Sequence, residues 1–204
     1  MSDVTNHPEQ TAHNSYAQPM NYPDTDLPVH DFSKGYHPEE ITKHTWSIGK
    51  YNEVRNQMYV SEIYTSRKAA IHMGIDIWTE AFAPVYAVAD GTLLGITNNN
   101  NHLDYGPTLV YEIEFDEKPL YVLYGHLNWD SIQELEAGMT LKKGQKLGLI
   151  GTVEENGGWV PHLHMQLSVN KPEKIDMPGV VDISDRKEAV NLYPDPQILT
   201  GNFY

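Results

Sequence analysis

Two histidines alternate with apolar residues in the stretch V-P-H-L-H-M-Q-L-S-V, residues 160–169. Alternation with period two is typical of a β-strand, whose successive side chains point to opposite faces of the sheet. One face of this strand would be apolar, and the other would present His162 and His164 side by side. Neighbouring imidazoles are costly to protonate together, whereas neutral imidazoles are common metal ligands. The stretch therefore indicates a metal ion with an acid/base group beside it.

A second stretch, I-H-M-G-I-D-I, places His72 four residues before Asp76, with Gly74 between them. In a regular strand the two side chains would share a face but lie too far apart to bind one ion. A bend at Gly74, which has no Cβ, could bring them together. A helix would also do so, but Gly74 and the β-branched isoleucines disfavour a helix. With His164 they would supply two nitrogens and one oxygen and leave a fourth tetrahedral position for water, as in a catalytic zinc site.

A third stretch, L-Y-V-L-Y-G-H-L, places His126 at the end of another expected strand. The motifs H-x-x-x-D, Y-G-H-L and P-H-L-H occur in this order between residues 71 and 169. Their arrangement resembles the lysostaphin/LytM-type zinc metallopeptidases, and the match of three ordered motifs is far more specific than any one of them. The family usually continues with an aromatic residue and a glutamate after H-x-H, where this chain has Met165 and Gln166.

The resemblance implies a role for each of five residues. Zinc would be bound by His72, Asp76 and His164, while His126 and His162 would be the remaining active-site histidines. Zinc held in this way lowers the pKa of its bound water from about 15.7 towards 7. One free histidine could take the proton of this water, and the other could stabilise the oxyanion or protonate the leaving amine. The sequence does not divide these two roles.

The overall composition limits the partners. The chain has 204 residues, a hydrophobic content of 40% and a formal net charge of −14, which argues against nucleic acid or an anionic membrane surface as partner. It has no cysteine, so disulfides and thiolate metal sites are excluded. The start M-S-D-V-T-N-H-P-E-Q has neither a basic segment nor an apolar segment of a signal peptide, and no transmembrane span is apparent. These features predict a cytoplasmic location.

Two parts of the chain differ in character. Residues 1–35 are polar, interrupted by prolines and without a basic residue before Lys34, which predicts an extended or disordered arm. Residues 36–204 are expected to form a single metallopeptidase-like catalytic domain, consistent with their length.

Short β-rich runs separated by turn residues predict a mainly β, antiparallel fold. Asp90-Gly91, between two apolar runs, is a hairpin signal, and residues 108–127 predict a second hairpin. Residues 58–64 predict a strand that enters the core, and residues 171–189 predict a loop. The resemblance implies the same lysostaphin/LytM-like fold, an antiparallel sheet with a zinc-containing groove.

The sequence thus predicts a zinc metallopeptidase, an endopeptidase that uses metal-activated water on a peptide such as a peptidoglycan fragment. Two alternatives remain open: a catalytically inactive, metal-containing binding or regulatory module, and a non-haem iron oxygenase with a two-histidine, one-carboxylate triad. A finer resemblance rests on D-Y-G-P, E-N-G-G-W and Y-P-D-P. These motifs resemble the peptidase-like module between the kinase and aminotransferase parts of bacterial fusion proteins, which implies an intracellular peptide or amide substrate.

Overall fold

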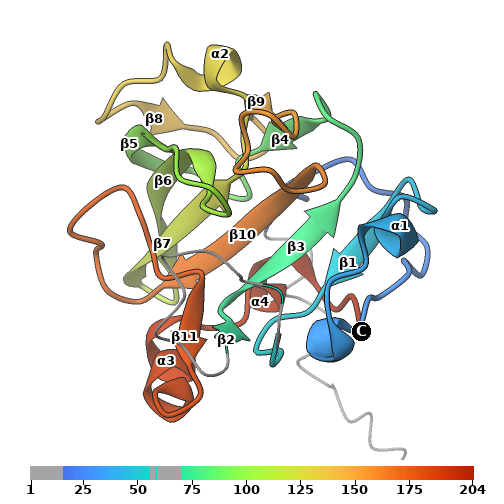
Figure 1. Ribbon diagram of the computed structural model, residues 1–204. Coiled ribbons are helices and arrows are strands. Elements are labelled where there is room, and N and C mark those ends of the chain that lie inside the picture. The colour runs from blue at the N-terminus through green and yellow to red at the C-terminus, as the bar shows by residue number, and fades with distance from the viewer. Residues whose placement is uncertain (1–15, 56–57, 59–69) are drawn as a thin grey trace, which may run out of the picture.

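The computed structural model describes residues 16–55, 58 and 70–204 (Figure 1). Residues 1–15 of the predicted arm lie outside the described residues. The strand predicted at residues 58–64 also lies outside them, apart from Met58.

An antiparallel sheet forms the centre of the described part of the chain. Its seven strands have the order β1-β3-β10-β7-β6-β5-β8, and every neighbouring pair is antiparallel. The strands are β1 (Ser47–Gly49), β3 (Gly74–Trp78), β5 (Gly91–Asn99), β6 (Gly106–Phe115), β7 (Lys118–Gly125), β8 (Thr140–Leu141) and β10 (His162–Ser168). The predicted mainly β, antiparallel fold is confirmed.

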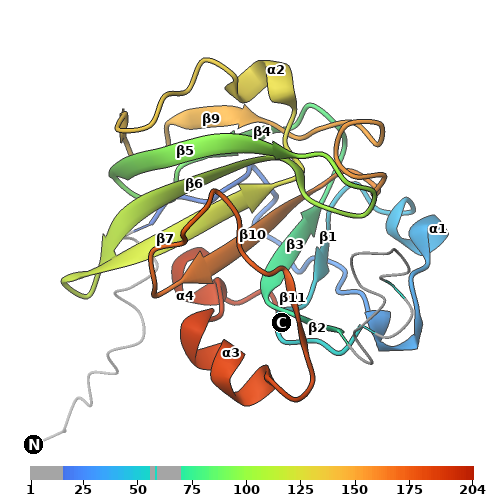
Figure 2. The ribbon, with the colours of Figure 1, turned by 60° about the vertical axis from the view of Figure 1, so that its left-hand side comes forward.

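Two short strand pairs flank this sheet. One joins β2 (Ala70–His72) to β11 (Val180–Asp182), and the other joins β4 (Pro84–Tyr86) to β9 (Lys146–Leu149). The β4/β9 pair lies with α2 (Trp129–Ile132) at one end of the molecule, and the β2/β11 pair lies with α3 (Arg186–Leu192) at the other (Figures 1 and 2). The remaining short helices are η2 (Phe32–Lys34), α1 (Pro38–Ile41) and α4 (Gln197–Thr200). Among the described helices, none has the length and apolar character needed to cross a membrane.

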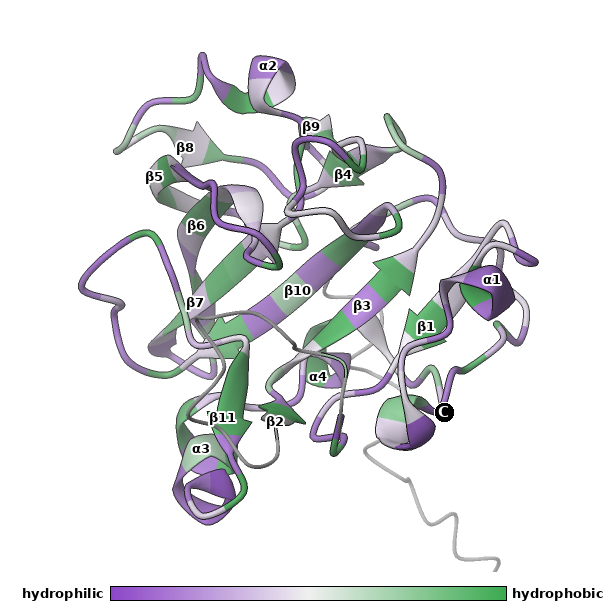
Figure 3. Ribbon diagram, viewed as in Figure 1, coloured by the Kyte–Doolittle hydropathy of each residue, from purple (hydrophilic) through white to green (hydrophobic). Residues whose placement is uncertain are grey.

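The alternation predicted for residues 162–168 is present in β10. Leu163, Met165 and Leu167 are fully buried in the main hydrophobic core, together with residues of the β4/β9 pair. The histidines and Gln166 lie on the opposite face and are also buried. Hydrophilic bands therefore cross β10 and β3 near the middle of the sheet (Figure 3). Both faces of the central strands are covered, and the polar side chains occupy one of them.

The Asp90-Gly91 hairpin prediction is wrong. The apolar run before it forms β4, which pairs with β9, whereas the run after it forms β5, which pairs with β6 and β8. Asp90 instead accepts hydrogen bonds from the Lys143 amide and the Lys142 ammonium group, at 2.8 Å each. The chain does turn between β4 and β5, but the two strands pair with other strands and not with each other.

The loop predicted for residues 171–189 is wrong in part, because it contains strand β11 and the first residues of α3. Of the predicted N-terminal arm, residues 16–35 follow a largely extended path and pack on the body. Met20 and Tyr22 belong to the main core, and the Ala17 amide donates to the Val88 carbonyl at 2.7 Å. The division of the chain at residue 35 stays a prediction.

Candidate metal centre

The sheet register places the candidate residues opposite one another. In the β3/β10 pair, Asp76 lies opposite His164 and Gly74 lies opposite Gln166. On its other side, β10 places His164 opposite Gly125 of β7, and His126 follows directly after that strand. Antiparallel pairing thus brings together residues far apart in the chain.

The chain changes sheets between His72 and Gly74. Strand β2 ends at His72 and pairs with β11, whereas β3 begins at Gly74 and joins the central sheet. Because of this interruption, the side chains of His72 and Asp76 lie close together, which they would not do in a continuous strand. Gly74 has a further role in providing space, because a Cβ there would lie 2.6 Å from the His164 ring and 2.6 Å from the Met165 carbonyl oxygen.

Three ligand atoms converge at the centre of the site. His72 Nε2 lies 3.1 Å from His164 Nδ1 and 3.3 Å from Asp76 Oδ1, and the last two atoms are 3.0 Å apart. All three side chains are about 2% exposed, and they form a group that could hold a metal ion. Ligands bound about 2.0–2.1 Å from a tetrahedral zinc ion lie about 3.3 Å from each other. The separations therefore fit a zinc ion.

Acceptors on the far sides of the two rings favour the tautomers that turn a lone pair towards Asp76. The Lys50 carbonyl lies 2.9 Å from His72 Nδ1, and a carbonyl can only accept, so this nitrogen carries the proton. His164 Nε2 lies 3.2 Å from Gln166 Oε1, which is likewise an acceptor. Both rings consequently turn a lone pair towards Asp76 Oδ1. With these tautomers the three atoms face one another as acceptors, an arrangement that a cation would stabilise.

Gln166 occupies the position where the family usually has glutamate. Its Oε1 accepts from His164 and, at 3.1 Å, from the Tyr105 hydroxyl, while its amide nitrogen donates to the Pro178 carbonyl at 3.3 Å. The glutamine is thus held in one orientation and holds the His164 ring in turn. Met165, the other departure from the usual pattern, points into the core and does not touch the site.

His126 and His162 lie beside the ligand group. His126 Nδ1 is 2.8 Å from the Asn156 carbonyl oxygen and His162 Nδ1 is 2.7 Å from that of Val160. Each ring therefore keeps a proton on Nδ1 and a lone pair on Nε2. The two ring centroids are 4.2 Å apart, and His162 Nε2 lies 3.7 Å from Asp76 Oδ1. Sequence reasoning had named both residues, and the structure brings them next to the three candidate ligands.

The His126 backbone has a positive φ of 63°, in the left-handed region that residues with a side chain rarely adopt. Two backbone hydrogen bonds hold it there: its amide donates to the Tyr105 carbonyl, and its carbonyl accepts from the Gly151 amide, both at 2.8 Å. Such conformations are concentrated at functional sites, where the surrounding structure imposes them. Here the strained residue turns an imidazole into the pocket at the end of β7.

Burial keeps the imidazoles of His72, His126 and His162 neutral. It lowers the pKa of His72 to about 4, with a further contribution from the Arg55 guanidinium, and it lowers the pKa of His162 to about 4. Burial and the neighbouring His162 ring lower the pKa of His126 well below its usual value. Burial by itself would raise the pKa of Asp76, but the neighbouring groups, which include the Arg55 guanidinium, outweigh it and hold this pKa well below its usual range. The site thus combines neutral nitrogen donors with an ionised carboxylate.

Arg55 is a site residue that sequence reasoning missed. Its Nη1 donates to Asp76 Oδ2 at 2.7 Å, so that the carboxylate turns its other oxygen towards His72 and His164. Tyr105 also lines the site, and its hydroxyl donates to Gln166 Oε1. Nothing in the periodicity marks Arg55, because residues 50–55 belong to no regular strand, and the contact depends on tertiary packing.

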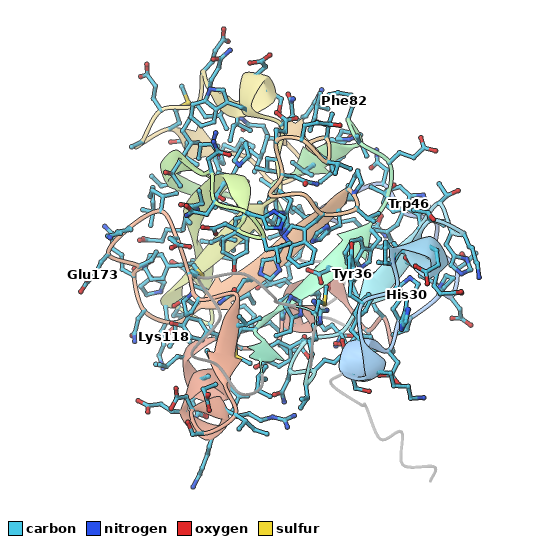
Figure 4. The ribbon with its side chains drawn as sticks, in the orientation of Figure 1. His30, Tyr36, Trp46, Phe82, Lys118 and Glu173 are labelled. Atoms are coloured by element: carbon cyan, nitrogen blue, oxygen red, sulfur yellow. The ribbon has the colours of Figure 1, made fainter. Side chains whose placement is uncertain are left out.

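These groups line a pocket whose other walls include Met58, Leu103 and Trp159. Trp78 stacks on the His162 ring at a centroid distance of 3.9 Å. Tyr36, labelled in Figure 4, contacts both Trp78 and Trp159, which extends this wall outwards. The pocket therefore offers apolar and aromatic contacts beside a polar floor, as is usual for substrate sites.

Comparison with known proteins identifies the family. The model of Peptidase family M23 matches residues 70–177, more than half of the chain, and the chain belongs to this family. The segment holds all five candidate residues. The resemblance to lysostaphin/LytM-type metallopeptidases is thus confirmed, and with it the enzyme class.

Individual relatives are similar over parts of their length. The chain is 32% identical over 122 residues to peptidoglycan DD-endopeptidase ShyB of Vibrio cholerae, which covers 58% of this chain and 26% of that protein. The chain therefore spans about a quarter of the length of this curated relative. A zinc containing peptidase from Vibrio cholerae is 32% identical, with 48% of this chain and 26% of that chain covered and a TM-score of 0.39. The catalytic domain of lysostaphin from Staphylococcus simulans is 21% identical, with 74% and 98% covered and a TM-score of 0.49.

Proposed function

We propose that this chain is a zinc-dependent endopeptidase that cleaves a peptide or amide bond in peptides of the peptidoglycan type. The observation that carries the proposal is the convergence of three acceptor atoms, from His72, Asp76 and His164, at separations of 3.0–3.3 Å in a buried pocket. Two neutral nitrogens and one carboxylate oxygen are a donor set that zinc accepts, with a position left for water. When bound there, zinc would acidify water and polarise the scissile carbonyl.

The hydrogen bonds of His126 and His162 limit what these residues can do. Each ring donates its Nδ1 proton to a backbone carbonyl, so in the resting state each can only accept a proton, at Nε2. Either ring can therefore act as the general base. It becomes a donor only after it has taken a proton, and it can then pass that proton to the leaving amine. Asp76 Oδ1, 3.7 Å from His162 Nε2, would stabilise the positive charge on that ring.

The substrate class is supported by similarity to the Vibrio cholerae peptidoglycan DD-endopeptidase. Family membership and the full set of two ligand and two free histidines disfavour both an inactive binding module and an iron oxygenase. An intracellular amide substrate and a cytoplasmic location stay predictions, which cell fractionation would test.

The direct test is digestion of purified peptidoglycan by the purified protein, with the products separated by chromatography and identified by mass spectrometry. We expect soluble peptide fragments, their loss after treatment with a chelator, and their return when Zn²⁺ is added. Elemental analysis of the same preparation distinguishes zinc from iron. Stoichiometric iron with oxygen-dependent turnover would contradict the proposal, and bound zinc without cleavage of peptidoglycan or its peptides would favour the binding module.

A further inference from the structure

The two oxygens of Asp76 have different partners. Oδ1 faces His72 and His164, whereas Oδ2 accepts from Arg55 Nη1 at 2.7 Å. We propose that Arg55, held by Glu53, is a positioning residue that restricts Asp76 to binding the metal through one oxygen. The inference rests on the proposed function, since it concerns the same metal site.

Arg55 is held in place by several groups. Its Nε donates to Glu53 Oε2 at 3.1 Å, and its guanidinium carbon lies 4.9 Å from the centre of the Phe32 ring. The side chains of Arg55 and Asp76 are only 1% and 2% exposed, so water does not compete for these bonds. A guanidinium is planar and its donors have fixed directions, so an arginine fixed on one side orients the carboxylate on the other.

Glu53 is itself anchored. Its Oε1 accepts from the Phe32 amide at 3.1 Å and lies 3.2 Å from Lys50 Nζ. The anchoring contacts thus run from Phe32 and Lys50 through Glu53 and Arg55 to Asp76. Lys50 also contributes the carbonyl that orients His72, so one short segment supports two of the three candidate ligands.

The charges of Arg55, Asp76 and a bound metal ion explain why a carboxylate is needed next to Arg55. A buried arginine next to a divalent cation would repel it, but the Glu53 carboxylate, which also pairs with Lys50, reduces this repulsion. Arg55 can thereby orient Asp76 without cancelling the charge that attracts the ion, and the outer ligand shell of metal sites commonly works in this way.

Gly49 makes room for the contact. It lies opposite Asp76 in the β1/β3 register, and a Cβ there would lie 2.7 Å from Arg55 Nη2 and 3.0 Å from Asp76 Oδ2. A methyl group at this position must displace the guanidinium or the Asp76 carboxylate. Gly49→Ala therefore disturbs the pair without removing a charge or a hydrogen-bonding group.

A positioning role and a merely structural role predict different measurements. If Arg55 only contributed to folding, its variants would unfold more easily but would coordinate metal as the wild type does. If Arg55 positions Asp76, the metal affinity and the coordination number change in protein that remains folded. Arg186 provides a matched control, because it donates to the side-chain and backbone oxygens of Asn52 at 2.8 and 2.9 Å, next to the same segment but with Asn52 rather than Asp76 as its partner.

The experiment compares the wild type with Arg55→Lys, Gly49→Ala and Arg186→Lys. Zinc affinity is measured by competition with a chromogenic chelator, and coordination is measured by the visible absorption of the Co²⁺-substituted proteins. We expect about 10–100-fold weaker zinc binding for Arg55→Lys and Gly49→Ala, the range typical for loss of an outer-shell partner. We also expect weaker Co²⁺ absorption in both, because a released carboxylate can bind through both oxygens and raise the coordination number. Arg186→Lys should match the wild type in both measurements.

Circular dichroism and melting of the metal-free proteins show that each variant is folded. If Arg55→Lys does not fold, Gly49→Ala alone decides the question. Zinc affinities and Co²⁺ spectra equal to those of the wild type and Arg186→Lys would overturn the inference while leaving the proposed function intact. Failure of the wild type itself to bind zinc would instead overturn the proposed function.

Discussion

The two faces of the central sheet differ in the hydrogen bonds of their buried polar atoms. On the core face, the Tyr111 hydroxyl donates to the Tyr124 hydroxyl at 3.1 Å, which donates to the Tyr86 carbonyl at 2.9 Å. On the other face, His72, His126 and His162 each bind a backbone carbonyl through Nδ1 and leave Nε2 turned into a shared pocket. Buried polar atoms are normally paired, so a group of buried acceptors that face each other marks the functional face.

This difference shows how a rigidly held site can keep lone pairs available for a metal ion or a proton. The backbone carbonyls fix the orientation and tautomer of each ring, and burial keeps the rings neutral, so the free lone pairs are already placed for a metal ion or a proton. The core face gains only stability from its polar groups. Variants on the two faces should therefore separate metal binding and turnover from the free energy of unfolding.

The largest effect is expected on the site face, from His164→Ala and His162→Ala. His164→Ala should lose both bound zinc and turnover, because it removes a candidate ligand. His162→Ala should keep zinc but lose about 10²–10⁴-fold in turnover, the usual contribution of a general acid/base group. Metal analysis together with a cleavage assay checks both variants. Equal loss of zinc in both variants would contradict the assignment of His164 as a ligand and His162 as an acid/base group.

On the core face, Leu163→Ala should have the opposite signature. Leu163 is fully buried between the two histidine positions of β10, and its truncation should lower the free energy of unfolding by about 2–5 kcal/mol. The protein that stays folded should bind zinc with unchanged stoichiometry. Chemical denaturation and metal analysis make the comparison. Zinc loss without a loss of stability would show that the two faces are not independent.

A smaller effect is expected from Gln166→Leu, which removes the acceptor of the His164 Nε2 proton. We expect about 10–100-fold weaker zinc binding, since the ring loses its orienting partner. Gln166→Glu keeps an acceptor at the same place, matches the residue usual in the family, and should remain near the wild type. Chelator competition measures both, and a Gln166→Glu variant as weak as Gln166→Leu would show that the amide itself is required.

The smallest effect concerns pH in the metal-free protein. The pKa of His162 is lowered from 6.5 to about 4 by burial, so below pH 6.5 the unfolded chain binds the proton that the folded protein refuses. Stability should therefore fall as the pH is lowered from 7 to 5, by about 2 kcal/mol from this group. His162→Gln should show a shallower fall in chemical denaturation at the two pH values. An identical pH dependence in the variant and the wild type would exclude this contribution.

Much of the site could be predicted because its signals are local. The alternation in β10 depends on residues two apart, and it is present as predicted, with Leu163 and Met165 on the core side. The H-x-x-x-D, Y-G-H-L and P-H-L-H motifs were sufficient to indicate the family. The hairpin predicted at Asp90-Gly91 was wrong because strand pairing is not a local property. A turn signal does not specify which strands will pair.

Side-chain periodicity and short motifs are properties of neighbouring residues, and the sequence by itself therefore determined the strands that carry the site, the family and the list of candidate histidines and aspartate. The tertiary structure alone decided that β3 and β7 flank β10, that the strand breaks between His72 and Gly74, and that Arg55 takes one oxygen of Asp76. These features arise from contacts between segments that are distant in the sequence. Their geometry depends on how the strands pair and pack in the folded protein.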